Sequence, residues 1–113
     1  MKKIEAIIKP FKLSQVKEAL HELGISGMTL IDVKGFGRQR GSTGGIDPND
    51  GYDDEFLAKM KLEVIVEDNS VNDVIESIKT SAYSGKIGDG KIFVSNIEQV
   101  IRIRTGEKDS DAV

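Results

Sequence analysis

The feature of this chain that most constrains its fold is a pattern of strand, helix and strand that occurs twice. The runs expected to form strands are short and rich in Ile and Val, and in the helical segments apolar residues recur every three or four positions. The expected strands are 4–9, 28–36, 59–67 and 91–95, with helices at 13–23 and from 71 onwards and a last extended run at 100–103. Two such halves predict an α+β protein with a ferredoxin-like double βαβ fold.

A long segment without apolar periodicity separates the two halves. Residues 37–55 are rich in Gly, Asp and other residues that disfavour regular strands and helices. Loops of this length inside a compact domain are usually functional or disordered. We therefore expect a single domain, residues 1–113, that carries this segment as a functional loop.

Charge and composition exclude several functions. Sixteen Lys and Arg against 19 Asp and Glu give a net charge of −3, which offers no general attraction for nucleic acid or an anionic membrane. Aromatic residues make up 5% of the chain, too few for a platform on which bases stack. Without cysteine, the chain has neither a disulfide nor a thiolate nucleophile. We expect no direct contact with nucleic acid.

The sequence carries no signal for membrane insertion or export. Its first residues lack an apolar signal-peptide core, and no run of about 18 apolar residues occurs. We expect a cytoplasmic protein, or a stromal one if the source is a plant or an alga.

The expected helices can cover only one face of the sheet. Ile, Val and Leu occupy both alternating sets of positions in several expected strands, so the second face is also partly apolar. An uncovered apolar face would promote aggregation. We therefore expect a homo-oligomer in which sheets pack against each other.

A glycine-rich segment before the last expected strand is the first candidate for binding chemistry. It reads Gly-Lys-Ile-Gly-Asp-Gly-Lys from Gly85 to Lys91. Glycines let backbone amides approach a phosphate closely, and a lysine neutralises its charge. The Ser or Thr and the following helix of a Walker motif are missing. By itself the segment fits a phosphate cradle or, more commonly, a tight turn with solvated lysines.

Two arginines, Arg102 and Arg104, form the second candidate. At a spacing of two they would point to the same side of an extended segment, and paired guanidinium groups can bind several phosphate oxygens. The spacing fits a solvated edge strand equally well.

A third cluster, basic and glycine-rich, runs from Gly35 to Gly41. Gln39 offers a neutral carbonyl oxygen of the kind that binds Mg²⁺, although the cluster also suits a hinge. His21 lies opposite the apolar stripe of its helix and is expected to be solvated, and the acidic run 47–55 lacks the ligand order of an EF-hand. No pairing of nucleophile and base suggests catalysis.

Taken together, these segments resemble the PII signal-transduction family, the nitrogen regulatory protein PII, over almost the whole chain. The matching patterns are MKKIEAIIKPFKL at 1–13, GMT at 27–29, VKGFGRQ at 33–39, GKIGDGKIFV at 85–94 and IRIRTGE at 101–107. The resemblance implies a ferredoxin-like homotrimer that senses ATP or ADP and 2-oxoglutarate and regulates nitrogen or linked carbon metabolism. It implies a regulatory binding protein, not an enzyme, whose long T-loop binds target enzymes, transporters or regulators.

The resemblance also implies a set of ligand-binding residues. ATP or ADP would be bound by Gly27, Met28, Thr29, Gly35, Gly37, Arg38, Glu63, Ile65, Ile87, Gly88, Asp89, Gly90 and Lys91, with Arg102 and Arg104 from a neighbouring subunit. 2-Oxoglutarate would be bound by Lys9, Gln39, Arg40, Gly41 and Lys59, and Gln39 would also ligate Mg²⁺. The corresponding segments are the T-loop 37–55, the phosphate-binding loop 83–90 and the C-terminal loop 105–113.

The T-loop departs from the family pattern. Members commonly carry a Glu-Leu-Tyr-Arg-Gly type segment where this chain is rich in Gly and Asp, and no basic residue lies between Arg40 and Lys59. Tyr52 aligns with the tyrosine that some bacterial members uridylylate and is a candidate modification site. The alternatives are a PII-like regulator of another transporter with a different effector, or a small nucleotide-hydrolysing enzyme, against which the absence of a nucleophile or base argues.

Overall fold

The structure is a computed structural model that describes residues 1–36 and 56–113. Its elements are the strands β1 (Lys2–Ile8), β2 (Thr29–Phe36), β3 (Phe56–Val66) and β4 (Lys91–Asn96) and the helices α1 (Leu13–Glu22) and α2 (Val71–Ala82). Each expected strand of the double βαβ pattern and both expected helices are present. The largest difference in extent is in β3, which begins at Phe56 where the sequence predicts Lys59.

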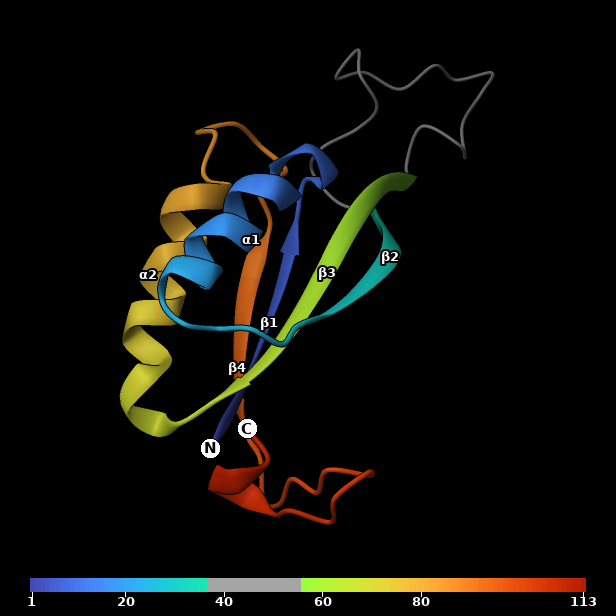
Figure 1. Cartoon of the computed structure of the whole chain (residues 1–113). Coiled ribbons are helices and arrows are strands. Elements are labelled where there is room, and N and C mark those ends of the chain that lie inside the picture. The colour runs from blue at the N-terminus through green and yellow to red at the C-terminus, as the bar shows by residue number, and fades with distance from the viewer. Residues whose placement is uncertain (37–55) are drawn as a thin grey trace.

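The four strands form one antiparallel sheet in the order β2-β3-β1-β4. The central strand β1 pairs with β3 on one side and with β4 on the other, and β2 pairs with β3 alone. Both helices cover the same face of this sheet (Figure 1). The prediction of a ferredoxin-like fold is confirmed.

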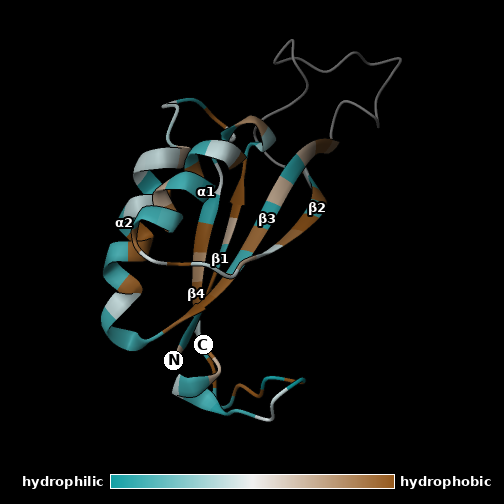
Figure 2. Ribbon diagram, viewed as in Figure 1, coloured by the Kyte–Doolittle hydropathy of each residue, from teal (hydrophilic) through white to brown (hydrophobic). Residues whose placement is uncertain are grey.

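The core lies between this face and the helices. Alternate positions of β1 and β3 supply Ile4, Ala6, Ile8, Leu62, Val64 and Val66, and the helices supply Val16, Leu20, Val74, Ile78 and Ala82. Figure 2 shows the resulting bands of apolar and polar residues on the helices. The helix predicted at 13–23 was one residue too long. Leu23 lies beyond the end of α1 and is 44% exposed, so it does not belong to the buried apolar stripe of this helix.

The opposite, open face of the sheet is partly apolar, as expected, with Ile31 and Phe93 exposed on its outer strands. At its centre Lys3, Glu5, Lys61 and Glu63 form a closed ring of ion pairs. The Lys3 ammonium lies 3.2 Å from Glu5 and 3.5 Å from Glu63, and that of Lys61 lies 3.1 and 3.6 Å from the same carboxylates. Hydrogen bonds from Lys61 and Lys3 lower the pKa of Glu5. The ring carries no net charge.

The C-terminal segment does not form the expected extended run at 100–103. A single bridge joins Ile101 to Lys108, and the Gly106 amide donates a hydrogen bond of 2.8 Å to the Arg102 carbonyl, closing a turn. The argument that Arg102 and Arg104 share one side of a strand is therefore wrong. Among residues 1–36 and 56–113, no strand of the sheet pairs with the apolar residues that suggested a strand.

Ser70 stands at the start of α2 as expected, but its side chain makes no capping hydrogen bond. Within the described ranges, no helix has the length and apolar character needed to cross a membrane.

Candidate functional site

A cavity of about 640 Å³ opens on the open face, at the end of the sheet where β1 and β2 end and β3 and β4 begin. Its wall includes three lysines, Lys59, Lys86 and Lys91, and one acidic residue, Asp89. Residues 36 and 56, which flank the long loop, are at this end of the sheet. The charge balance of the wall favours an anionic ligand.

Gly90 fixes the segment before β4 against the sheet. Its φ is +101°, and a Cβ built at this position would lie 1.6 Å from the carbonyl oxygen of Ile7 in β1. Only glycine can occupy a position that has both this backbone conformation and this close an approach.

Asp89 closes the loop that precedes β4. Its carboxylate accepts hydrogen bonds from the backbone amides of Ser84 (2.8 Å) and Gly85 (2.9 Å) and from the Ser84 hydroxyl. Burial alone would raise the pKa of Asp89, but these hydrogen bonds and one from Lys9 outweigh it and hold the pKa well below its ordinary value. Asp89 therefore stabilises the shape of this loop as a carboxylate.

Lys9, which was expected to help bind 2-oxoglutarate, is buried beside the same loop. Its ammonium group lies 3.3 Å from Asp89 and donates a hydrogen bond of 3.1 Å to the Ser84 hydroxyl, and the residue is only 6% exposed. These contacts hold the loop together.

Lys59 reaches the loop from β3. Its ammonium group donates a hydrogen bond of 2.7 Å to the carbonyl oxygen of Gly88. Burial and the nearby positive charge of Lys9 lower the pKa of Lys59, and Asp89 acts in the opposite direction. The side chain remains on the cavity wall, where an anion could reach it.

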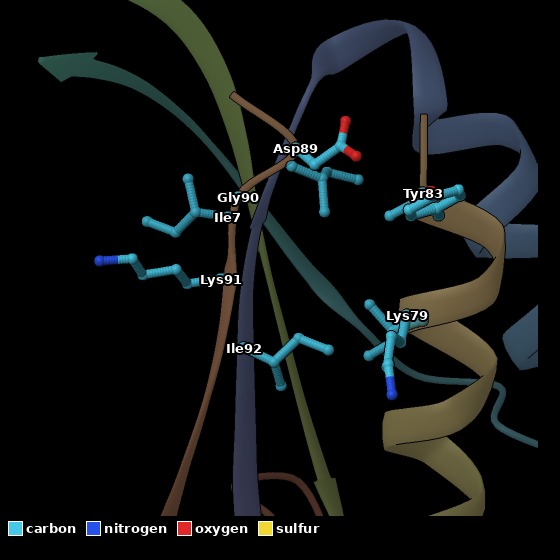
Figure 3. Close-up of a pocket in the computed structure, with 10 residues that line it drawn as sticks. Ile7, Lys79, Tyr83, Asp89, Gly90, Lys91 and Ile92 are labelled. Atoms are coloured by element: carbon cyan, nitrogen blue, oxygen red, sulfur yellow. The ribbon is translucent and has the colours of Figure 1, made fainter. Parts of the chain in front are cut away.

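Lys91 differs from these lysines in its freedom. Its side chain is exposed and has no hydrogen bond or ion pair with any residue in the described parts of the chain. In Figure 3 the side chains of Lys91 and Asp89 leave the backbone on opposite sides. On the helix side the same segment borders a second, smaller hollow of about 260 Å³ between α2 and the sheet, lined by core residues such as Ile8 and Ile78.

The predicted nucleotide-binding residues fall in two places on one chain. Ile87, Gly88, Asp89, Gly90, Lys91 and Gly35 line the cavity with Lys59. Gly27, Met28 and Thr29 lie at or just before the start of β2, where Thr29 pairs with Glu63, and Ile65 follows two residues along β3. Because β2 and β4 are the two edge strands of the sheet, they are three strand spacings apart, roughly 14 Å in total.

Arg102 and Arg104 are not at the cavity. The segment that carries them lies at the opposite end of the sheet from the loop before β4 (Figure 1). Arg102 forms an ion pair of 2.9 Å with Glu107, whose carboxylate also accepts a hydrogen bond of 2.7 Å from Thr105, and both arginines are exposed. One chain alone does not bring the arginines to Lys91.

Some predicted residues lie outside the described part of the chain: Gly37, Arg38, Gln39, Arg40, Gly41 and Tyr52. Among the described residues, no group of three or more His, Asp or Glu is placed to hold a metal ion.

Sequence reasoning assigned no role to Ser84, and it named Lys86 only as part of the glycine-rich segment. The Ser84 hydroxyl accepts from Lys9 and from the Lys86 amide (3.3 Å) while it donates to Asp89. A Ser whose hydroxyl accepts from the amide two residues later is a common turn pattern, but the contact of Ser84 with Lys9 could not be read from the local sequence.

Comparison with known proteins decides which family this arrangement represents. The family described as "Nitrogen regulatory protein P-II" matches residues 1–107. The chain belongs to the PII family. Proteins named nitrogen regulatory protein P-II from Azospirillum brasilense and Microchaete diplosiphon are similar to it, at 58% and 57% identity over the full length of both chains.

A solved PII structure supports the same assignment. Arabidopsis thaliana PII bound to citrate has a TM-score of 0.82 and 42% identity, and the match covers 99% of this chain and 91% of that one. PII proteins are named as regulators, not as enzymes, so the chain has a PII signalling role in nitrogen regulation. The alternative of a nucleotide-hydrolysing enzyme is not supported.

Proposed function

We propose that this PII protein senses ATP or ADP together with 2-oxoglutarate and transmits their levels through the T-loop to target proteins. The observation that carries the proposal is the lysine-rich cavity at the end of the sheet. It combines Lys59, Lys91 and the glycine-rich segment with Phe36, directly before the T-loop, and Leu57, two residues after it. A ligand there would contact the residues from which the T-loop leaves the domain.

The phosphates of the nucleotide would be bound at Gly88, Gly90 and Lys91. Lys91 is exposed and makes no ion pair within the described ranges, so binding a phosphate costs no existing contact. Arg102 and Arg104 would complete the site from a neighbouring subunit of a homotrimer, since in their own chain they lie at the other end of the sheet. The adenine and ribose would contact the region of Thr29 and Glu63.

Mg²⁺ would need few protein ligands here. Mg²⁺ usually keeps waters and binds one or two protein groups plus substrate phosphates. The described residues supply no carboxylate cluster for it, and Gln39 would be its protein ligand. The bound ion would link nucleotide phosphates and the keto acid, whose distal carboxylate would pair with Lys59.

The signal would be transmitted by a shift in the populations of T-loop conformations. Different ligands at the residues flanking the T-loop would favour different T-loop conformations, each with its own affinity for a target protein. The acidic composition of residues 47–55 favours a target with a basic or neutral groove. Tyr52 would be the place for covalent modification, and the cytoplasm or plastid stroma the place of action.

The decisive experiment uses two variants that each remove one side of the shared site, Lys91→Met and Arg102→Ala. ATP binding is measured by calorimetry for each variant and for a sample refolded from an equal mixture. If the site lies between chains, mixed oligomers contain interfaces with both groups intact, and part of the binding returns. If the mixture binds no better than the two variants separately, the shared site is refuted.

A second titration tests the effectors. Mg-ATP should tighten 2-oxoglutarate binding, and by linkage 2-oxoglutarate should tighten Mg-ATP binding by the same factor. Equal 2-oxoglutarate affinity with and without nucleotide would refute the coupling.

A further inference from the structure

We propose that Ser84, Asp89 and Lys9 form a clip that positions Gly88–Lys91 for phosphate binding, and that Asp89 and Lys9 do so without touching the ligand. The inference rests on the proposed function, because it assigns roles within the same nucleotide site. It changes the roles of two residues, since both were expected among the ligand contacts. It also adds Ser84 to the site.

The hydrogen-bonding capacity of Asp89 is already used inside the loop. A carboxylate offers about four acceptor positions. Asp89 accepts from two backbone amides, from the Ser84 hydroxyl and from the Lys9 ammonium group. No acceptor position is left for a ligand, and a second anion beside this carboxylate would be repelled.

Lys9 is equally committed. Its side chain is 8% exposed, and its ammonium group lies between the Asp89 carboxylate and the Ser84 hydroxyl. Breaking the ion pair to reach a ligand would leave a nearly buried ammonium group and a partly buried carboxylate without each other, which is costly. The lysines that can meet a ligand without this loss are Lys91 and Lys86, which are exposed on the wall of the cavity.

The clip is one of three attachments that hold the segment. The second is Gly90, which lies against the backbone of Ile7, and the third is the hydrogen bond from Lys59 to the Gly88 carbonyl. Figure 3 shows that two side chains of this segment point in opposite directions. Asp89 points toward the helices, and Lys91 points away from them. The clip holds the segment from the helix side and leaves the Lys91 side chain available on the cavity wall.

The test compares Ser84→Ala with Ser84→Thr. Alanine removes every hydrogen bond of the hydroxyl, whereas threonine keeps a hydroxyl at the same position. We expect Ser84→Ala to weaken ATP binding about tenfold, which is the loss of roughly one or two hydrogen bonds, and Ser84→Thr to restore it. Amide exchange should become faster in residues 85–91 of the alanine variant and stay at the parent rate in the rest of the chain.

A second pair of variants separates positioning from direct contact. Removing a lysine that touches phosphate reduces the salt dependence of binding, because one fewer screened charge pair is involved. Lys91→Met should lower the dependence of ATP affinity on salt, whereas Lys9→Met should weaken binding and leave that dependence at the parent value. An equal reduction for Lys9→Met would show that Lys9 contacts the phosphates and overturn the proposal.

The controls are Ser14→Ala and Asp32→Asn. Both side chains are exposed and form no hydrogen bond or ion pair with other described residues, so ATP affinity should not change. ATP binding by the parent protein is the separate check on the proposed function. Once the parent binds ATP, equal affinity of Ser84→Ala and the parent refutes the clip.

Discussion

The segments before and after β4 both carry basic residues of the proposed site, but the first is held against the sheet, whereas the second is closed by hydrogen bonds within itself. Residues 84–91 are held by the clip, by Lys59 and by contact with β1. In the segment after β4, Ile103 is fully exposed and Ile101 is 53% exposed. Under the proposed function, one half of the site would be prepared within each chain and the other half would be completed by assembly.

The largest expected effect is on stability, and it comes from replacing one glycine by alanine in each of the two segments. Gly90→Ala places a methyl group on the Ile7 carbonyl at a positive φ, and we expect a loss of about 3 kcal/mol or more of unfolding free energy. Gly106→Ala also has a positive φ, but a Cβ there meets nothing within 4 Å, so about 1 kcal/mol is expected. Urea denaturation measures both, and equal losses would contradict the contrast.

The next effect concerns binding and leaves stability unchanged. Arg102→Ala should weaken ATP binding at least about tenfold, because charge-assisted hydrogen bonds to phosphate are lost. Its thermal midpoint should match that of the parent, since Arg102 is exposed and its ion pair with Glu107 lies at the surface. A large drop in the thermal midpoint would mean that this segment is part of the folded core after all.

A smaller effect should appear on acidification. The pKa of Asp89 is lower in the folded chain than its ordinary value of 3.8, so its contribution to stability is complete above that value. It is lost as the pH falls further and the carboxylate becomes protonated. The Tyr83 hydroxyl lies beside Gly85, so in a Tyr52→Phe background the fluorescence of Tyr83 reports on this loop.

The change in Tyr83 fluorescence on acidification should disappear in Asp89→Asn. The matched control is Asp32→Asn, which should keep it. A transition that survives in Asp89→Asn would assign the pH dependence to another group.

The smallest effect is expected on the open face. Glu5→Gln breaks two ion pairs of the ring, but the ring is partly solvated, and exposed ion pairs contribute little. We expect little change in the denaturation midpoint at low protein concentration. A larger loss that grows with protein concentration would indicate that this face is buried between chains.

The sequence predicted the fold because its strongest patterns reflect burial within one chain. Alternation in β3 and the three-to-four spacing in α2 lead directly to buried Leu62, Val64, Val74 and Ile78. The segment after β4 was predicted wrongly for the same reason. Ile101 and Ile103 are apolar as in a strand, yet no sheet edge of the described chain pairs with them.

The candidate site was predicted only in part. Glycine and lysine content identified the segment 85–91, but the inward position of Lys9 could not be read from local pattern. It depends on which strand lies beside β4. That Lys59 reaches Gly88 likewise follows from the strand order, in which β1 lies between β3 and β4.

The strand order also has a consequence for synthesis on the ribosome. All three strand pairings involve β3 or β4, and none joins β1 to β2. When the first 36 residues have emerged, β1 and β2 are both present but do not pair with each other. A sheet can begin to form only when residues 56–66 are available. Because such distant contacts are slow to form, the nascent chain must keep the apolar positions of β1 from aggregating until most of the protein has been made.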